Sequence, residues 1–192
     1  ARAHSMAMPA PTAMRSYSVA EAYAFPDDGN RYEVVHGELL VTPAPRSVHQ
    51  VVVAQFFFRL EHYLAPLGLE RTLLPGPADI FWGDDVWVQP DLLVVVPEEI
   101  TTDWHTFKTL RLVIEVLSPS SVRGDRLVKR RAYQENGVAT YWIVDADRRV
   151  VEVWHPGDDV PELVTDELRW RVSPDAPECA IPLGEVWAAL PR

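Results

Sequence analysis

The chain of 192 residues has little of several features, and each scarcity excludes a class of protein. Cys179 is the only cysteine, so no disulfide can form within the chain, and a reducing cytoplasm is the expected location. No apolar run approaches the roughly 20 residues that cross a bilayer, so we expect no membrane partner. The first residues lack the continuous apolar segment of a signal peptide. Nine glycines against seventeen prolines favour ordered turns over a flexible low-complexity chain.

The remaining composition is that of an ordinary soluble globular protein, with 47% hydrophobic and 24% charged residues. A chain of this length is expected to fold as one domain. We therefore predict a single domain over residues 17–192. Residues 1–16 begin without methionine and are interpreted as a disordered lead or a cloning remnant.

Positive charge is also scarce, because 18 Lys and Arg face 28 Asp and Glu, a net charge of −10. This balance argues against a general nucleic-acid binder, which needs clustered cations. Five cations nevertheless lie within nine residues: Arg123, Arg126, Lys129, Arg130 and Arg131. This cluster is either a phosphate-binding face, formed mainly by Arg123, Arg126 and Arg130, or an ordinary solvated helix face. Lysine occurs only twice, so Lys129 calls for a specific reason.

The apolar patterns predict an α/β chain without internal repeats. An N-terminal β-hairpin is expected within residues 31–42, with a tight turn at His36-Gly37. Helices are expected at 47–68, with a capping box of Ser47 and Gln50, at about 125–135, and as a short closing element within 181–190. Further strands are expected at 69–74, 78–82, 86–88, 90–96 and 111–117, with a loop at 97–109 between the last two. A hairpin is expected at 140–155.

Two acids stand next to or inside predicted buried strands. Asp91 opens one strand, and Glu115 interrupts the apolar run of another. If the strands are neighbours, their carboxylates converge, repel each other and resist ionisation, and a divalent cation would resolve both problems. Lys129, one helical turn after Asp125, could orient an attacking water and stabilise phosphate charge beside that cation. Two carboxylates, a metal and a lysine suit phosphodiester hydrolysis.

The order of these residues resembles a restriction-endonuclease-like family within the PD-(D/E)xK nuclease superfamily. The resemblance covers about residues 17–155 and rests on these matches: Tyr32-Glu33, Gly37-Glu38, His49, Pro90-Asp91, Glu115-Val116-Leu117-Ser118-Pro119, Asp125, Lys129, Tyr133, Gly137-Val138 and Tyr141-Trp142. It implies a mixed sheet flanked by helices.

The same resemblance implies the roles of the site residues. Asp91 and Glu115 would hold Mg²⁺ or Mn²⁺ with the Val116 carbonyl, and Glu38 would be an auxiliary acid. The sequence departs from the superfamily at Leu117, where the lysine normally stands. Lys129 would then be its replacement from the following helix. His36 also replaces the usual Asp or Asn before Gly-Glu.

Asp91 and Glu115 have alternative interpretations that need no metal. Asp91 could cap the turn before its strand. Glu115 could form a salt bridge with an arginine such as Arg111 or Arg123, since an unpaired buried charge is costly.

The other candidates could lie at the surface. Asp125 and Lys129 have the i, i+4 spacing of a surface ion pair. Glu38, beside a turn, could be solvated. His49, in the first turn of a predicted helix, is placed outside the core site.

The sequence therefore predicts a metal-dependent endonuclease that acts on DNA rather than RNA. A homodimer would suit this activity, because nucleases that cut both strands often pair their subunits. One alternative is a catalytically inactive module of the same fold that binds nucleic acid or a protein. Another is a glycoside hydrolase with two catalytic acids, which needs neither metal nor lysine and predicts an aromatic-lined cleft.

Overall fold

A computed structural model describes residues 15–191, apart from the side chain of Trp104. Of the lead predicted at residues 1–16, only Arg15 and Ser16 fall within this range, and the rest lies outside the described residues. Within residues 15–191, none of the helices combines the length and apolarity needed to cross a bilayer.

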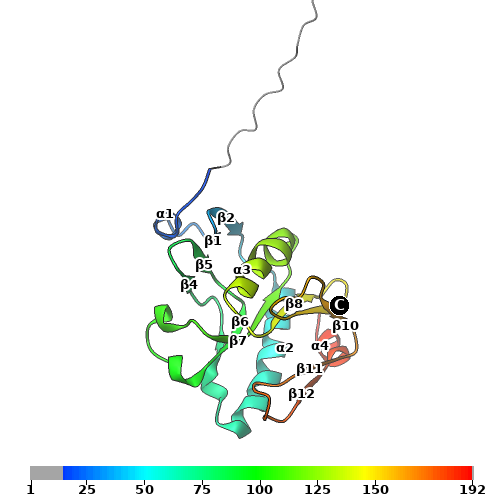
Figure 1. Cartoon of the computed structure of the whole chain (residues 1–192). Coiled ribbons are helices and arrows are strands. Elements are labelled where there is room, and N and C mark those ends of the chain that lie inside the picture. Colours follow the sequence, from blue (N-terminus) through cyan, green and yellow to red (C-terminus); the bar gives the residue numbers. More distant parts are fainter. Residues whose placement is uncertain (1–14, 192) are drawn as a thin grey trace, which may run out of the picture.

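A four-stranded antiparallel sheet forms the N-terminal end of the molecule (Figure 1). Its strands lie in the order β2 (Glu38–Thr42), β1 (Arg31–Val35), β5 (Val86–Val88) and β4 (Ile80–Trp82), and α1 (Val19–Tyr23) packs against β1. The predicted hairpin is confirmed, because Val35 pairs with Glu38 across a two-residue turn. His36 and Gly37 both have positive φ, 49° and 84°, as a type I′ turn requires.

A six-stranded mixed sheet forms the centre of the chain. Its order is β10 (Glu162–Val164), β9 (Val150–Trp154), β8 (Tyr141–Asp145), β7 (Leu110–Val116), β6 (Leu92–Val95) and β3 (Leu73–Pro75). The pair β7–β8 is parallel and the other pairs are antiparallel. The parallel pair needs a crossover, and residues 117–140 supply it with α3 (Arg130–Glu135).

Helices cover both faces of the central sheet. One hydrophobic cluster joins one face to α2 (Ser47–Leu64) and α4 (Leu183–Ala188), and a second joins the opposite face to α3, β4 and β5. Leu112, Ile114 and Val116 of β7 belong to the first cluster and Val113 to the second. The period of two along a strand therefore directs Glu115 toward the side of α3. The predicted mixed sheet flanked by helices is confirmed.

The helix α2 starts where predicted, but its predicted capping box is wrong. Arg46 is the N-cap residue, with no side-chain capping bond. The chain does have a capping box at α1, where Ser18 Oγ accepts from the Glu21 amide at 3.2 Å and Glu21 Oε2 accepts from the Ser18 amide at 2.8 Å. The helix ends at Leu64 and continues as a 3₁₀ turn to a left-handed Gly68.

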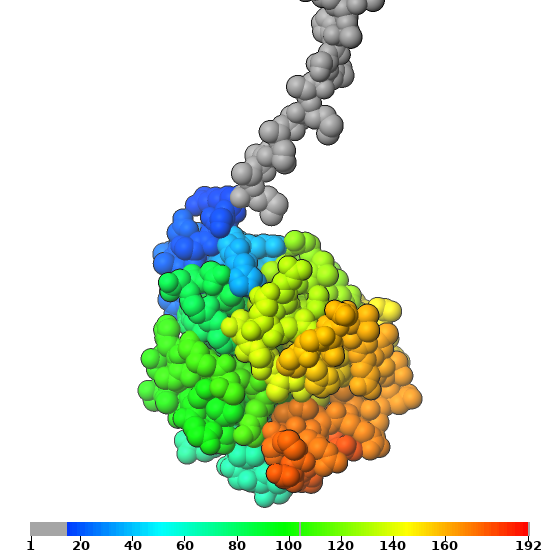
Figure 2. All heavy atoms as spheres, in the orientation of Figure 1, coloured from blue at the N-terminus to red at the C-terminus, as the bar shows by residue number. Residues whose placement is uncertain are grey.

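Three other segments depart from the predicted elements. Within the strand predicted at 69–74, Glu70–Thr72 form a 3₁₀ turn, and β3 starts only at Leu73. The crossover helix begins as a π-helical segment, Gly124–Lys129, before α3. Residues 156–182 contain strands that the sequence did not predict, namely β10 and the ribbon of β11 (Glu167–Trp170) and β12 (Cys179–Pro182). The predicted closing helix is confirmed as α4. Figure 2 shows this C-terminal part, in orange and red, at the end of the molecule away from the blue N-terminal residues.

Candidate functional site

A buried ion cluster lies between β7, the crossover and the N-terminal hairpin. The ammonium of Lys129 donates to Glu115 Oε1 at 2.7 Å and to Glu33 Oε1 at 3.1 Å. Its side chain is only 2% exposed, and those of both acids 1%. Each residue comes from a different element: Glu115 from β7, Lys129 from the end of the π-helical segment, and Glu33 from β1.

Two further residues complete this cluster. Asp125 lies in an ion pair with Lys129, at 3.0 Å from its Nζ, and is equally buried. The Tyr133 hydroxyl donates to Glu115 Oε1 at 2.8 Å. The surface interpretation of the Asp125–Lys129 pair is therefore wrong. The extra residue per turn in π-helical backbone widens the segment that holds both residues, a feature frequent at functional sites.

The electrostatics of the cluster depend on Lys129. Burial raises the pKa of Glu115 well above its usual value; Lys129 opposes this rise, while Asp125, Asp91 and Glu33 add to it. Burial lowers the pKa of Lys129, but its three carboxylate neighbours outweigh burial and raise the pKa well above the ordinary lysine value. The ammonium is therefore the cation that makes a carboxylate tolerable inside β7.

Asp91 occupies a second group of contacts at the start of β6. Its Oδ2 accepts from the Val116 amide at 2.9 Å and lies 2.9 Å from His49 Nε2, while its Oδ1 accepts from Arg31 Nη1 at 3.0 Å. Burial alone would raise the pKa of Asp91, but the bond to His49, the charge of Arg31 and the Val116 amide lower it well below its usual range. Asp91 is therefore an ionised acid.

The three bonds also define how much of the Asp91 carboxylate is left for a ligand. A carboxylate offers about four lone-pair directions. His49 and Val116 use both directions of Oδ2, and Arg31 uses one direction of Oδ1. The second lone-pair direction of Oδ1 is therefore the one that these three bonds leave open to a ligand. His49 holds Asp91 from α2, and its Nδ1 is buried with no hydrogen-bond partner in the part of the chain described.

A pocket of about 560 Å³ opens beside Asp91. Asp91, His49, Arg31 and Val116 line it, together with the serine-rich turn at 118–121 and Arg46. Neither Glu115 nor Lys129 is among its lining residues, and neither is any Trp, Tyr or Phe of the described chain. The structure thus joins Glu115 to Lys129 directly, away from the pocket. Asp91 lines the pocket and has different hydrogen-bond partners: His49, Arg31 and Val116.

The two groups of contacts are nevertheless adjacent. Leu92 pairs with Ile114 across β6 and β7, so Asp91 and Glu115 stand one residue beyond this pair on neighbouring strands. Arg31 lies between the groups, since its pKa is raised by Glu33, Asp91 and Glu115 together, against the lowering effect of burial. Within residues 15–191, no group of three or more His, Cys, Asp or Glu side chains is placed to hold a metal ion.

The charges of the two groups are not balanced. Four buried carboxylates, those of Glu33, Asp91, Glu115 and Asp125, face two permanent cations, Lys129 and Arg31. Two negative charges would stay uncompensated with all four acids ionised, and burial, which raises the pKa of both Glu115 and Asp125, opposes that state in the absence of a further cation. One divalent cation would match them. Mg²⁺ usually takes one or two carboxylates and keeps several waters, so the two oxygen-bearing strands fit it without a third protein acid.

Other predicted site residues lie elsewhere. Glu38 forms its ion pair with Arg123 and is not joined to Asp91 or Glu115 in the structure. Glu33, rather than Glu38, shares the buried cluster with Glu115 through its ion pair with Lys129. Arg111, a predicted partner of Glu115, donates instead to the Val172 carbonyl at 3.2 Å.

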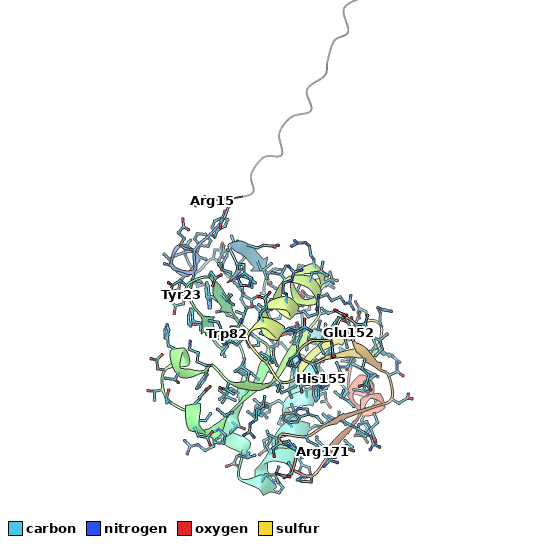
Figure 3. The ribbon with its side chains drawn as sticks, viewed as in Figure 1. Arg15, Tyr23, Trp82, Glu152, His155 and Arg171 are labelled. Carbon is cyan, nitrogen blue, oxygen red and sulfur yellow. The ribbon has the colours of Figure 1, made fainter. Side chains whose placement is uncertain are left out.

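The predicted phosphate-binding arginines differ in their surroundings. Arg126 donates to Glu152 at 2.6 Å and to Asp145 at 2.9 Å, two buried acids of β9 and β8. Figure 3 labels Glu152 near β8 and β10, away from the end of the molecule that carries Arg15 and Tyr23. Arg130 lies over the Trp154 ring at 4.5 Å. Arg123 is exposed apart from its bond to Glu38.

The sequence analysis did not assign Arg31 or Glu33 to the site, and it placed His49 outside the core site. Glu33 and His49 did belong to the quoted family pattern, which was the available signal. The side chain of His49 is 10% exposed, because α2 packs this turn against Asp91.

Comparisons with known proteins address the family and the fold. A crystal structure of a "putative nuclease belonging to DUF820" from Anabaena variabilis is similar, with a TM-score of 0.72 and 17% sequence identity over 90% of this chain and 98% of that one. A search among curated proteins found no match. The profile of the Uma2 family, described as "Putative restriction endonuclease", matches residues 19–184. A match over this much of the sequence makes the chain a member of the Uma2 family.

Proposed function

We propose that the protein hydrolyses phosphodiester bonds of nucleic acid, with DNA as the preferred substrate, in a reaction that requires Mg²⁺ or Mn²⁺. The observation that carries this proposal is an ionised acid, Asp91, at the wall of a pocket and next to a second, sealed acid whose charge is only partly compensated. Membership of a family described as "Putative restriction endonuclease" supports the reaction class.

Asp91 and Glu115 would hold the cation, with the Val116 carbonyl as a further oxygen donor. When bound, a divalent cation supplies a polarised water and neutralises charge on the phosphate. Hydrolysis forms a bond from the water oxygen to phosphorus and breaks the bond to the leaving oxygen, which takes up a proton.

The chain's own residues prepare this site. Val116 and His49 fix the orientation of Asp91 through its Oδ2. Lys129 favours the carboxylate form of Glu115, because its ammonium donates to Oε1 and opposes the effect of burial on the pKa of Glu115. The sequence predicts that Lys129 contacts the attacking water, whereas in the structure its Nζ is engaged by buried carboxylates and Lys129 does not line the pocket. A role exerted through Glu115 therefore fits its surroundings better.

The pocket also bears on the alternative enzyme class. A glycoside hydrolase was expected to have an aromatic-lined cleft, whereas the lining described here contains prolines, serines and charged side chains. The inactive nuclease-fold module would bind nucleic acid or a protein partner without cleaving, so cleavage is the property to measure. The homodimer and the cytoplasmic location stay predictions of the sequence.

The test compares wild type with Asp91→Asn. Duplex DNA, single-stranded DNA and RNA are incubated with Mg²⁺, with Mn²⁺ and with EDTA, and Mn²⁺ binding is measured by calorimetry. We expect wild type to cut DNA only with a divalent cation, and Asp91→Asn to lose both cleavage and Mn²⁺ binding.

Asp27→Asn is the matched control, since Asp27 lines the same pocket but its Oδ1 accepts only a local bond from Gly29 at 3.3 Å. This variant should behave as wild type. Cleavage that persists in EDTA would contradict the metal requirement. Binding of nucleic acid without cleavage under any condition would instead favour the inactive module.

A further inference from the structure

Arg31 lines the pocket beside Asp91 but has no role in the proposed hydrolysis. It is the first residue of β1, and its Nη1 donates to Asp91 Oδ1 across 60 positions of sequence. The side chain is 23% exposed and lines the pocket, so the guanidinium contacts both a buried acid and the open space beside it.

A guanidinium and a divalent cation would compete for the same oxygen. Both lone-pair directions of Asp91 Oδ2 are used by His49 and Val116. A cation that binds Asp91 must therefore take the remaining direction of Oδ1, on the same atom to which Arg31 donates. Two cations on one oxygen repel each other strongly in a partly buried setting. Binding of the divalent cation would therefore weaken or displace the bond from Arg31.

A displaced Arg31 would remain in the pocket. The hydroxyl-bearing turn at 118–121 lines the same space, and the other arginine of the lining is Arg46. A guanidinium presents a planar fork of five N–H donors that matches the paired oxygens of a phosphate group. Of the arginines predicted to bind phosphate, Arg126 is held by two buried acids and Arg130 by Trp154. The third, Arg123, is exposed but does not line this pocket.

We propose that Arg31 is an exchangeable counter-ion: it neutralises Asp91 in the metal-free protein and, once a divalent cation occupies that carboxylate, it binds a phosphate group of the substrate. This inference rests on the proposed function and identifies the residue that couples metal binding to substrate binding. It requires that metal and phosphodiester binding respond to Arg31 in opposite directions, which a purely structural arginine would not produce.

The experiment uses the full chain with two probes, Mn²⁺ alone and a phosphorothioate-linked oligonucleotide that resists cleavage. Mn²⁺ affinity is measured by calorimetry and oligonucleotide affinity by fluorescence anisotropy, with and without Mn²⁺. For Arg31→Gln we expect Mn²⁺ to bind several-fold more tightly, because its competitor is gone. The oligonucleotide should bind about tenfold more weakly in Mn²⁺, as expected for losing a hydrogen-bonded charge.

Two further variants separate charge from geometry. Arg31→Lys keeps the charge but not the fork, so its Mn²⁺ affinity should stay near wild type while oligonucleotide affinity falls. Arg46→Gln removes the same charge from the same pocket without removing the bond to Asp91, and its Mn²⁺ affinity should stay within about twofold of wild type.

The outcomes are distinct. Weaker Mn²⁺ binding by Arg31→Gln, with wild-type binding intact, would overturn this inference and leave the proposed function standing. Wild type that binds no Mn²⁺ would overturn both. If Arg31→Gln does not fold, Arg31→Lys decides, and its unchanged oligonucleotide affinity would show that Arg31 does not bind the phosphate.

Discussion

Removal of the Lys129 ammonium is the most direct test of the buried ion cluster. Lys129→Met keeps the length of the side chain and its apolar stem but removes the one cation that contacts Glu33, Glu115 and Asp125. Breaking a buried ion pair by deleting one partner costs about 3–5 kcal/mol. Since domains are typically stable by about 5–15 kcal/mol, this variant should lose a large share of its free energy of unfolding.

The size of the loss can be derived independently from proton uptake. One proton can replace the lost positive charge, because a protonated Glu115 is neutral and can donate to its neighbour. Protonating a glutamate of ordinary pKa near 4.3 costs about 3.7 kcal/mol at pH 7 and about 1 kcal/mol at pH 5, and these are upper limits because burial already raises the pKa of Glu115 in wild type. The two estimates agree at neutral pH, and the second adds a pH dependence.

The sign follows from linkage. Without Lys129, the folded-state pKa of Glu115 rises further above its unfolded value, so the folded variant binds more protons than the unfolded chain. Its stability relative to wild type therefore falls as pH rises between the raised folded-state pKa of Glu115 in wild type and the still higher one in the variant. Adding Glu115→Gln to Lys129→Met removes the charge without a proton and should recover part of the loss at pH 7.

Urea unfolding followed by circular dichroism at pH 5 and pH 7 measures these losses. Arg131→Met is the matched control, because Arg131 is an exposed cation two residues along the same crossover, and its effect should stay within about 0.5 kcal/mol. A loss below about 1 kcal/mol for Lys129→Met at pH 7, or an equal loss at both pH values, would refute the role of Lys129 as the buried counter-ion.

Three other changes test separate parts of the structure. His36 bridges two carboxylates, and both bonds raise its pKa. His36→Asn, which suits the positive φ, should lower the free energy of unfolding by under about 1 kcal/mol below pH 6.5 and by nothing once the folded-state pKa is exceeded. An equal loss at pH 9 would contradict this. Arg126→Ala should lower the melting temperature, since it leaves Glu152 unpaired, without weakening oligonucleotide binding; the reverse result would return Arg126 to the phosphate-binding face. A Cβ at Gly76 would collide with the Pro90 carbonyl, so Gly76→Ala should displace Asp91 and weaken both stability and Mn²⁺ binding in calorimetry, and wild-type behaviour would contradict it.

The sequence predicted the part of the site whose signal is local. The charge of an acid inside an apolar strand has to be compensated, and the rarity of lysine in the sequence singles out Lys129 as the cation. The structure joins Glu115 and Lys129 by a bond of 2.7 Å. Asp91 was found for a similar reason, as an acid at the start of a strand that is buried at all four of its residues, Leu92–Val95.

The partners from β1 could not be derived in this way. Arg31 and Glu33 alternate with Tyr32 and Val34, and this alternation is what a strand with one solvated face also shows. Glu33 is nevertheless 1% exposed, because the crossover packs over it. That burial arises from contacts between residues almost 100 positions apart, such as Glu33 and Lys129, which no local pattern records.

The π-helical segment and the C-terminal strands were missed for other reasons. Asp125 and Lys129 have a spacing that is equally compatible with an α-helix, and their burial arises only from docking against β7 and β1. The strands β10, β11 and β12 have three or four residues each and lie in a proline-rich tail, so their apolar alternation is too short to detect.

The position of Arg31 and Glu33 on one strand gives the N-terminal hairpin a specific part in the site. Residues i and i+2 of a strand point to the same face, so β1 presents a cation and an acid side by side. Arg31 bonds to Asp91, which faces the pocket, and Glu33 bonds to Lys129, which is sealed beneath it. A shift of β1 relative to β6 and β7 would therefore change the charge balance at both Asp91 and Glu115 at once. Gln89 lines the pocket, and its backbone N–H donates to Glu33 Oε1 at 2.6 Å, so the hairpin joins the pocket wall to the buried cluster.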